Sequence, residues 1–438
     1  MSPWSVARSP LPLAQSFGCH GQRTTASRKM ISFEHALNLV AEKLAAAQLS
    51  PATEMVSLAE ARGRVLARDV LADRDYPPFP RSTRDGYAVR AADVRAPPAW
   101  LACVGEARAG APYPGKLGPG KLGEESGVCV EIMTGAPLPP GADAVVMMER
   151  THREGSCIEI LRGVEPGENV VRQGSEAPSG GVVLPRGRRV SPGEMALLAS
   201  LGATAVEVFR QPTVAILPTG DEVVPIDRQP RWFEIRNSNA IALGGQVAAA
   251  GGIPHQLGIA ADEASRLREL IEAGLECDLL LLSGGVSAGK YDLVEQVLAE
   301  LGAEFYFQSV ALRPGKPTVF GRVRGKFFFG LPGNPVSTFV TFEVFARPAI
   351  AVLSGAAFER PLLLRARLGK PFRQSHGLTA FMPARVEMPD GDPVVTPVGW
   401  QGSGDLVGLA AANCLLVVHP HQTELAAGEW VDVWPKLD

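Results

Sequence analysis

One stretch, residues 278–294, constrains the fold of this chain more than any other. It begins with four consecutive leucines, Leu279 to Leu282, and continues through Ser283-Gly284-Gly285 and Ser287-Ala288-Gly289-Lys290 to Asp292. An apolar run without alternation is typical of a strand covered on both faces, as in a parallel α/β sheet. Glycines after such a strand let backbone N–H groups approach an anion at the carboxyl edge of the sheet. The stretch predicts either a phosphate-binding loop or a tight strand-to-helix turn with Asp292 as the helix N-cap.

Composition excludes several classes of protein. A chain of 438 residues predicts two to four domains, and 46% apolar residues are enough for ordinary globular cores. The net charge of −3 offers no basic field for nucleic acid or an anionic membrane, and no apolar run is long and charge-free enough to span a bilayer. The six cysteines are scattered without a CxxC pair, which favours reduced thiols in the cytoplasm over disulfides or a zinc site.

The first 29 residues contain four basic residues, no Asp or Glu, and several Ser and Pro. They lack the apolar region of a secretory signal, so we expect a disordered extension or a start codon assigned too early, with a transit peptide as the alternative. Met30 precedes a helical pattern over 32–49, with Ser32 as a plausible N-cap. This helix could pack on the α/β domain described below.

A discontinuous N-terminal domain of mixed structure is predicted over 30–72 and 173–209, including a short helix from Leu58 to Val65. Residues 73–172, rich in Gly, Pro and short apolar runs, predict an inserted β-domain. Within it Asp85 precedes Gly86, and is either a turn aspartate or a carboxylate presented from a rigid loop. Thr134 lies in a loop after a predicted strand and offers a hydroxyl group.

Residues 210–356 alternate strands and helices, which predicts an α/β domain with a parallel sheet, including one strand over 305–312. Three predicted strands end in polar, Gly-rich loops: PTGDE at 218–222, SGGVSAGKYD at 283–292 and LPGNPVS at 331–337. Right-handed crossovers place successive loops at the same end of a sheet, so the three loops should converge. In the third, Asn334 is a candidate N-cap with Pro335 at the first helical position.

Residues 357–438 show short strands, turns and no convincing helix, which predicts a small β-barrel or sandwich. The segment Gly402-Ser403-Gly404 has the composition of a turn.

Seven motifs together resemble the molybdopterin molybdenumtransferase family, which includes the gephyrin E domain. In chain order they are PPFPRSTRDGYAV (77–89), MTGAPLPPGADAVV (133–146), LPTGDEVV (217–224), IRNSN (235–239), LLSGGVSAGKYD (281–292), RPGKP (313–317) and GLPGNPVS (330–337). The resemblance runs from about residue 30 to the end. It implies a multidomain α/β plus β fold: a mixed domain, an inserted β-domain, a three-layer molybdopterin-binding α/β domain and a C-terminal β-barrel. It also implies an elongated homodimer whose active site lies between the α/β domain of one subunit and the β-domain region of the other.

The reaction implied by the resemblance converts adenylylated molybdopterin and molybdate to molybdenum cofactor and AMP with a divalent cation, usually Mg²⁺. Carboxylates can hold Mg²⁺, which neutralises charge on phosphates. The functional positions that match are Asp85, Thr134, Glu222, Asp262 and Asp292, and our hypothesis assigns Asp85, Glu222 and Asp292 to the metal. Asp262 is also a good N-cap for the helix predicted over 264–274.

The resemblance further implies a set of binding residues on the glycine-rich loops. They are Thr219, Gly220, Ser283, Gly284, Gly285, Ser287, Gly289, Arg313, Pro314, Gly315, Lys316, Pro332, Gly333, Asn334, Pro335 and Ser337, with Arg385 and Ser403 extending the molybdate site from the C-terminal domain. Two positions depart from the family pattern: Glu176 stands where Asp is frequent, and Arg313 where Lys is common. Arg presents a planar fork rather than a point charge, so it would hold molybdate differently.

Three alternatives remain open. A molybdopterin adenylyltransferase would share the SGG and LPGNP loops but would not need residues 51–209 or the barrel. A scaffold for receptor tails would not need the carboxylates, and a cofactor carrier would bind without turnover. The resemblance also implies transient contact with the adenylyltransferase and with molybdoenzymes.

Overall fold

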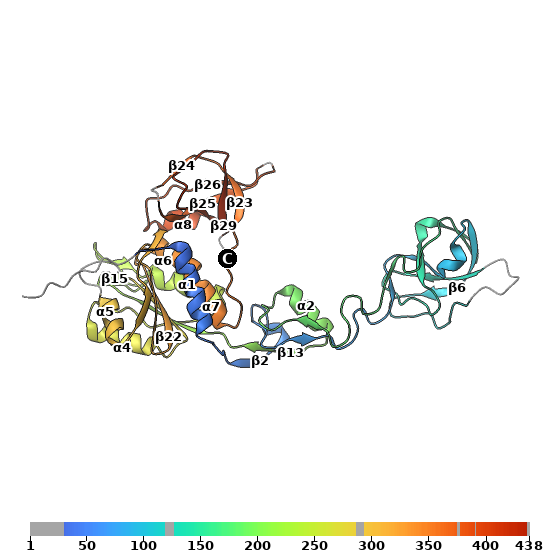
Figure 1. Cartoon of the computed structure of the whole chain (residues 1–438), viewed down its shortest axis with the longest axis horizontal. Coiled ribbons are helices and arrows are strands. Elements are labelled where there is room, and N and C mark those ends of the chain that lie inside the picture. Colours follow the sequence, from blue (N-terminus) through green and yellow to red (C-terminus); the bar gives the residue numbers. More distant parts are fainter. Residues whose placement is uncertain (1–29, 119–126, 286–292, 375–376, 390, 436–438) are drawn as a thin grey trace, which may run out of the picture.

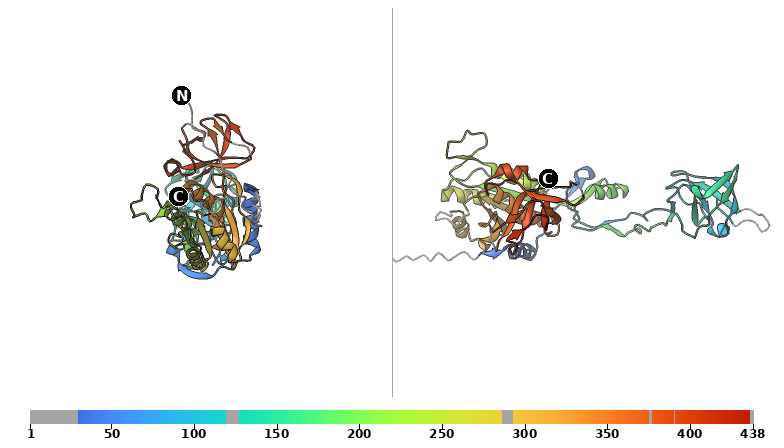
Figure 2. Two further views of the ribbon diagram at one scale, coloured as in Figure 1. Left: turned by 90° about the vertical axis from the view of Figure 1, so that its left-hand side faces the viewer. Right: turned by 90° about the horizontal axis from the view of Figure 1, so that it is seen from above.

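The computed structural model describes residues 30–118, 127–285, 293–374, 377–389 and 391–435. The molecule is elongated (Figure 1), with a β-domain at one end and an α/β domain beside a β-barrel at the other. A narrow segment joins the two ends, and the view from above in Figure 2 shows the same separation. The two ends therefore fold around separate cores.

The α/β domain is built on a six-stranded sheet within the described residues. Four neighbouring strands are parallel: β17 (Ile253–Gln256), β14 (Thr213–Pro218), β18 (Leu279–Ser283) and β22 (Lys326–Leu331). Next to them lies β21 (Val319–Val323), which runs antiparallel to both of its neighbours, β22 and the edge strand β19 (Glu304–Phe307). The predicted parallel sheet is thus wrong at one edge, where β21 and β22 form a hairpin around Gly325.

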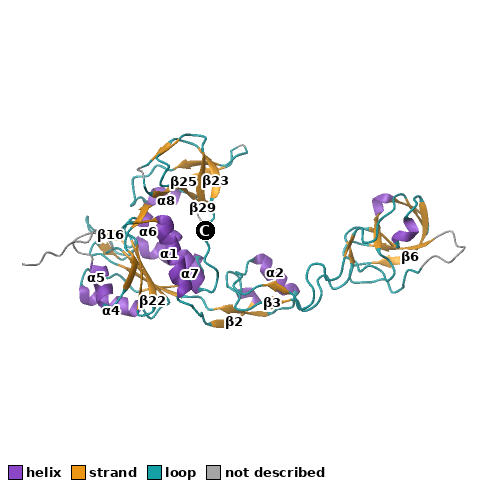
Figure 3. Cartoon of the chain, in the orientation of Figure 1, coloured by secondary structure: helices purple, strands orange, loops and turns teal. Residues whose placement is uncertain are grey.

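Helices cover both faces of this sheet (Figure 3). Successive side chains of a strand point to opposite faces, so Leu279 and Leu281 of β18 pack in one core, and Leu280 and Leu282 in another. The prediction of a strand buried on both faces is confirmed. The first core receives α1 (Phe33–Ala46), α3 (Ser238–Ala249), α6 (Pro335–Thr341) and α7 (Arg347–Leu353); the second receives α4 (Ala264–Gly274) and α5 (Leu293–Glu300).

The single strand expected over 305–312 is two strands in different sheets. β19 ends at Phe307, and β20 (Val310–Arg313) leaves the α/β sheet to pair with β1 (Ile31–Ser32) and β25 (Thr379–Glu387) of the barrel sheet. The apolar run continues through both strands because each buries side chains in the same first core. The Arg313-Pro314-Gly315 loop therefore follows a barrel-sheet strand.

The segment joining the two ends of the molecule is made of small antiparallel pairs: β2 (Thr53–Ser57) with β13 (Ala205–Phe209), and β3 (Val70–Leu71) with β12 (Val182–Leu184). Helix α2 (Pro192–Ser200) packs on them. The helix predicted from Leu58 to Val65 is only a 3₁₀ turn, Leu58–Glu60, since the chain then bends back and Val65 bridges to Arg189.

The β-domain holds a six-stranded sheet in the described part of the chain. In order across the sheet, the strands are β8 (Ala144–Met147), β5 (Gly86–Val89), β7 (Gly127–Ile132), β6 (Ala99–Ala107), β10 (Cys157–Ile160) and β9 (Thr151–Glu154). Short β4 (Arg81–Ser82) and β11 (Val170–Val171) pair at its base. Two hydrophobic clusters form a core that this domain does not share with the α/β domain.

The C-terminal domain is a closed barrel, because β25 pairs with both β26 and β27. Its remaining elements are β23 (Leu364–Leu368), β24 (Phe372–Arg373), β26 (Val394–Pro397), β27 (Cys414–Val418), β28 (Glu424–Leu425) and β29 (Trp430–Pro435). The expectation of no helix here is wrong: α8 (Leu406–Ala411) follows Asp405, whose carboxylate accepts a hydrogen bond from Gly408 N at 2.9 Å.

One helical stretch, residues 335–353, has the length and hydropathy of a membrane span, but 72% of it is buried inside the protein. It comprises α6, a π-helical turn over Phe342–Ala346, and α7, all packed in the first core. Burial in that core accounts for its apolar character.

Candidate functional site

The three Gly-rich loops of the α/β domain meet at one edge of the sheet. Pro218, Ser283 and Leu331 are aligned neighbours on β14, β18 and β22, so the loops that follow them lie side by side. A cavity of about 420 Å³ opens there. It is lined by Pro218, Thr219, Gly220, Glu222, Val223, Ile235, Arg236, Asn237, Ser238, Asn239, Asp262, Ser283, Gly284, Gly285, Pro317, Pro332, Gly333, Asn334 and Pro335.

The floor of this cavity is packed too closely for side chains. Gly284 has φ +94°, and a Cβ added to it would lie 2.6 Å from the carbonyl oxygen of Thr219. Thr219 N donates a hydrogen bond to the carbonyl oxygen of Ser283 at 2.9 Å, which ties the first loop to the second. The Thr219 hydroxyl is buried and has no hydrogen-bond partner among the described residues. Because an unsatisfied buried hydroxyl is costly, it is a plausible contact for a polar ligand.

Asn239 joins two of the loops, although our prediction left it out of the site. Its Nδ2 donates to Ser283 Oγ and to the carbonyl oxygen of Gly333, each at 2.8 Å. Asn237 caps the same helix, α3, by accepting from Ala240 N at 3.1 Å. Both belong to the IRNSN motif. The missed signal was that this motif opens a helix directly beside the sheet edge.

Carboxylates gather at one side of the cavity. Glu222 and Asp262 line it, and Asp221 Oδ1 accepts a hydrogen bond from Asp262 N at 3.0 Å. Partial burial raises the pKa of Asp262, and the nearby charges of Asp221 and Glu222 raise it further. The prediction that Asp262 is a helix N-cap is wrong: Glu263 occupies that position, without a side-chain cap bond. Asp262 therefore has no capping role, and Asp221 is a further site residue that the sequence reasoning missed.

Ser403 of the barrel domain reaches the cavity through Asn334. The Asn334 side chain donates to Ser403 Oγ at 2.8 Å, and Val336 N donates to the Ser403 carbonyl oxygen at 3.0 Å. Asn334 holds the N-cap position of α6 but makes no side-chain cap bond, since its side chain is used for this contact. Pro332, Gly333 and Pro335 line the cavity beside it, so this loop joins the barrel to the site.

Other predicted binding residues lie outside the cavity lining. Arg313 and Lys316 are exposed, Pro314 and Gly315 are buried beneath them, and only Pro317 of this loop lines the cavity. Ser337 is buried within α6. Arg385 pairs with Glu387 at 2.9 Å on the barrel surface. The predicted Ser287, Gly289 and Asp292 lie outside the described residues.

Asp85 and Thr134 form a pair in the β-domain. Asp85 Oδ1 accepts hydrogen bonds from Thr134 N at 2.6 Å and from Thr134 Oγ1 at 2.8 Å. These bonds, that from the backbone first, hold the pKa of Asp85 below its ordinary value. Both residues are exposed, and their domain lies at the far end of the molecule from the cavity (Figure 1). The structure therefore brings Asp85 and Thr134 together, and keeps both apart from Glu222 within one chain.

The carboxylates suit a hard cation by chemistry but are divided between domains. Carboxylate oxygens are the ligands that Mg²⁺ prefers, and the Glu222 and Asp262 side chains both belong to residues that line the cavity. Among the described residues, no group of three or more His, Cys, Asp or Glu side chains lies close enough to hold a metal ion. Glu222 and Asp262 could supply ligands from this domain, and further ligands would have to come from another source.

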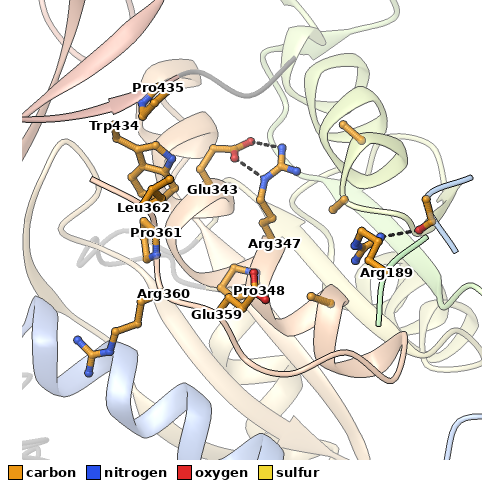
Figure 4. A pocket seen from close by; sticks show the side chains of 14 residues that line it. Arg189, Glu343, Arg347, Pro348, Glu359, Arg360, Pro361, Leu362, Trp434 and Pro435 are labelled. Carbon is orange, nitrogen blue, oxygen red and sulfur yellow. Dashed lines mark hydrogen bonds and ion pairs between the residues drawn. The ribbon is translucent and has the colours of Figure 1, made fainter. Parts of the chain in front are cut away.

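A second cavity, also about 420 Å³, lies at the junction of the α/β domain, the joining segment and the barrel (Figure 4). Several of its charged side chains are engaged with protein groups: Arg347 pairs with Glu343 at 2.5 Å, and Arg189 donates to the Gly63 carbonyl oxygen at 2.7 Å. Trp434 forms part of the opposite wall. It contains none of the predicted site residues, and we interpret it as a joint between domains.

The fold and the cavity define a multidomain protein in which an α/β domain with a Gly-rich candidate site at its sheet edge lies beside a β-barrel. Three family models match the chain in order: "MoeA N-terminal region (domain I and II)" at 31–202, "Probable molybdopterin binding domain" at 215–352 and "MoeA C-terminal region (domain IV)" at 365–436. The chain belongs to this family of transferases in molybdenum cofactor biosynthesis, as the motifs predicted.

Individual relatives agree with that assignment. A Bacillus subtilis protein named molybdopterin molybdenumtransferase is 36% identical over 390 residues, which cover 87% of this chain and 89% of the relative. A Staphylococcus epidermidis protein of the same name is 33% identical, with 86% and 90% covered. A solved structure of the molybdopterin biosynthesis moeA protein from Pyrococcus horikoshii OT3 has a TM-score of 0.74 and 30% identity, with 93% of this chain and 100% of that chain covered.

Proposed function

We propose that this chain inserts molybdate into adenylylated molybdopterin and releases AMP, producing molybdenum cofactor. The observation that carries the proposal is the cavity at the sheet edge. It combines a glycine-lined floor where backbone N–H groups could contact a phosphate, a Thr219 hydroxyl that has no hydrogen-bond partner among the described residues, and two carboxylates, Glu222 and Asp262. Backbone N–H groups can bind phosphate oxygens, and a charge-neutralising group stabilises the charge that develops when a phosphoanhydride is cleaved.

Each group of residues has a distinct part in this proposal. The Ser283-Gly284-Gly285 loop and Thr219 would bind and orient the phosphates. Asn239 holds the second and third loops in register through its two 2.8 Å hydrogen bonds. Arg313 and Lys316, exposed on the neighbouring loop, would attract molybdate to this edge, with Ser403 positioned by Asn334.

We propose that Mg²⁺ is held by Glu222, with Asp262 beside it and Asp292 as a further expected ligand. When bound, the ion would neutralise charge on the phosphates and on the leaving AMP. Without it, the neighbouring carboxylates of Asp221, Glu222 and Asp262 would repel an anionic substrate.

The second half of the site is proposed to come from a homodimer partner. Asp85 is exposed, held by Thr134, and remote from the cavity of its own chain. A second copy that placed its β-domain against the cavity would add this carboxylate to Glu222 and Asp262. We propose that the dimer works in the cytoplasm, with transient contacts to a molybdopterin adenylyltransferase and to molybdoenzymes.

The test is a turnover assay with adenylylated molybdopterin, Mg²⁺ and molybdate, measuring AMP and molybdenum cofactor. We expect molybdate-dependent AMP release that falls at least about a hundredfold in Glu222→Gln, the scale of removing a group that acts on the reacting atoms. Glu272→Gln is the matched control, because Glu272 lies in the same domain and only pairs with Arg324 at the surface. Tight binding without AMP release would contradict the proposal and favour a carrier. In a parallel assay that supplies molybdopterin and ATP instead, release of pyrophosphate would favour an adenylyltransferase.

A further inference from the structure

Arg236 is the one basic residue among those that line the sheet-edge cavity in the part of the chain that the structure describes. It lies on β16 (Ile235–Arg236), and it is exposed to solvent. The same cavity is lined by the carboxylates of Glu222 and Asp262. An anionic substrate would meet two negative side chains and a single positive one, so Arg236 marks the part of the lining that attracts a phosphate group.

The strand that carries Arg236 is joined to the segment that follows Glu222. β16 pairs in parallel with β15 (Val223–Val224), and Arg236 is aligned with Val224. Ile235 N donates a hydrogen bond to the carbonyl oxygen of Glu222 at 2.9 Å. These backbone contacts place Arg236 on the same side of the cavity as the carboxylate to which we assign the metal.

The guanidinium group of Arg236 is oriented by neutral oxygen atoms. Its Nε donates to the carbonyl oxygen of Arg228 at 3.2 Å, and its Nη2 donates to Gln229 Oε1 at 3.2 Å. Neither acceptor is charged, and no described carboxylate forms an ion pair with Arg236. Since a guanidinium group carries five N–H donors in a planar fork, N–H groups of Nη1 and Nη2 remain available for an anion.

The loop that supplies these oxygen atoms is held by a buried carboxylate. Residues 225–236 project from the α/β domain beside the cavity (Figure 2). The Glu234 side chain accepts from Arg231 N at 2.7 Å and from Arg231 Nε at 2.8 Å, and it pairs with Arg228 at 3.3 Å. Glu234 therefore neutralises the other two arginines of the loop and leaves the charge of Arg236 free. A cation held in place in this way loses less conformational freedom when it binds an anion.

We propose that Arg236 binds the phosphate of the adenylyl group, as the cationic partner of the glycine-lined floor. This inference rests on the proposed function, in which a nucleoside monophosphate group lies at this edge of the sheet. Arginine suits the role because its planar fork can donate two parallel hydrogen bonds to phosphate oxygens. The residues assigned to molybdate lie on other loops: Arg313, Lys316 and Ser403.

Equilibrium binding of AMP tests the role of Arg236 without turnover. Calorimetric titration of the full chain with AMP and Mg²⁺ should give a Kd about tenfold weaker in Arg236→Gln, the scale of losing a hydrogen bond to a charged group. Arg236→Lys keeps the charge without the fork and should lose about threefold. Arg266→Gln is the matched control, because Arg266 lies in the same domain and pairs with Glu269 at the surface. Unchanged affinity in Arg236→Gln, or no AMP binding by the wild type, would overturn the proposal.

Two further measurements separate phosphate binding from other roles of Arg236. Gln229→Ala removes one acceptor of the guanidinium group but keeps its charge, so the affinity for AMP should fall less than about threefold. Equal losses in Gln229→Ala and Arg236→Gln would assign Arg236 to support of the loop and overturn the proposal. Molybdate binding should be unchanged in Arg236→Gln, and a loss of molybdate affinity without a loss of AMP affinity would likewise overturn it.

The outcome for Arg236 is distinguishable from the outcome for the transferase. If the wild type shows no molybdate-dependent AMP release but Arg236→Gln still weakens AMP binding, the phosphate site stands and the transferase reaction is contradicted. If the wild type releases AMP and Arg236→Gln binds AMP as tightly as the wild type does, the reaction stands and the role of Arg236 is overturned.

Discussion

The α/β domain and the β-domain each carry acidic candidate site residues. The two domains differ in the packing that holds these residues in place. The α/β domain buries a large core that is shared with α1, β20 and barrel residues, so its loops are fixed by packing from several sides. The β-domain has two small clusters of its own and is linked to the rest through two short antiparallel pairs. A sheet edge can gather several candidate site residues within one domain, whereas Asp85 lies exposed with Thr134 in a separate domain.

The largest effect is expected for substitutions that test whether the two cores unfold independently. Phe329 is fully buried on β22, and its ring stacks on Phe320 at 4.7 Å. Phe329→Ala should lower the free energy of unfolding of the α/β domain by about 3–5 kcal/mol through lost burial and a cavity. Hydrogen exchange should show faster exchange in the α/β domain and the barrel, with the β-domain unchanged. Ile158→Ala, at a fully buried position of the β-domain, is the reciprocal variant. If either substitution loosens both regions equally, the two cores are not independent.

The next effect tests whether the two regions serve one reaction. Asp85→Asn and Glu222→Gln should each reduce AMP release about a hundredfold or more while leaving the thermal stability of both domains nearly unchanged. Since residues that act as a unit are non-additive, the double variant should be little slower than either single variant. Full multiplication of the two losses, measured in the same steady-state assay, would show that the two carboxylates act independently.

The chain order of glycine-rich loops was enough to predict the cavity, because consecutive parallel strands must present their ends at one edge. Ser283 and Gly333 do meet there. The sequence could not show that Val310 leaves the sheet that Phe307 belongs to, since both strands feed the same core and the apolar pattern is continuous. Nor could local pattern separate Asp262 from Glu263 as the helix cap, because boundaries shift easily by one residue.

A smaller effect concerns the support of Asp85 by its neighbour. Thr134→Val removes the 2.8 Å hydroxyl bond but keeps the 2.6 Å bond from the backbone N–H. A hydrogen bond to a charged group contributes about 1.5–3 kcal/mol, so with one of two bonds retained we expect a loss of about tenfold in kcat/KM. Thr134→Ser keeps the hydroxyl and should stay within about threefold. Equal losses in both variants would contradict a specific role of the hydroxyl, and a larger loss in Thr134→Ser than in Thr134→Val would indicate that the methyl group matters instead.

The short-range pairing of Asp85 with Thr134 was not visible in the sequence, where 48 residues separate them. They meet because β5 pairs antiparallel with β7, which places the turn before Gly86 beside the loop after Ile132. The sequence likewise gave no indication of how far Asp85 lies from the cavity. The family resemblance implied a site shared between subunits, and the arrangement of domains explains why Asp85 lies far from Glu222 within one chain.

The smallest effect lies in the segment that joins the two regions. Ser191 and Glu194 form a reciprocal cap at the start of α2, with Glu194 also paired to Arg188. Ser191→Ala should cost about 1 kcal/mol, seen as faster exchange in α2 with both large cores unchanged. Hydrogen bonds from Ser191 and then Arg188 lower the pKa of Glu194 from 4.5 to about 2. A depressed carboxyl pKa stabilises the fold fully above the unfolded value and loses that contribution as pH falls toward the folded value. The difference in protection between the wild type and Glu194→Gln should therefore be constant from pH 7 to about 5 and shrink below about 4.5; a difference that grew with acid would contradict the assigned cap.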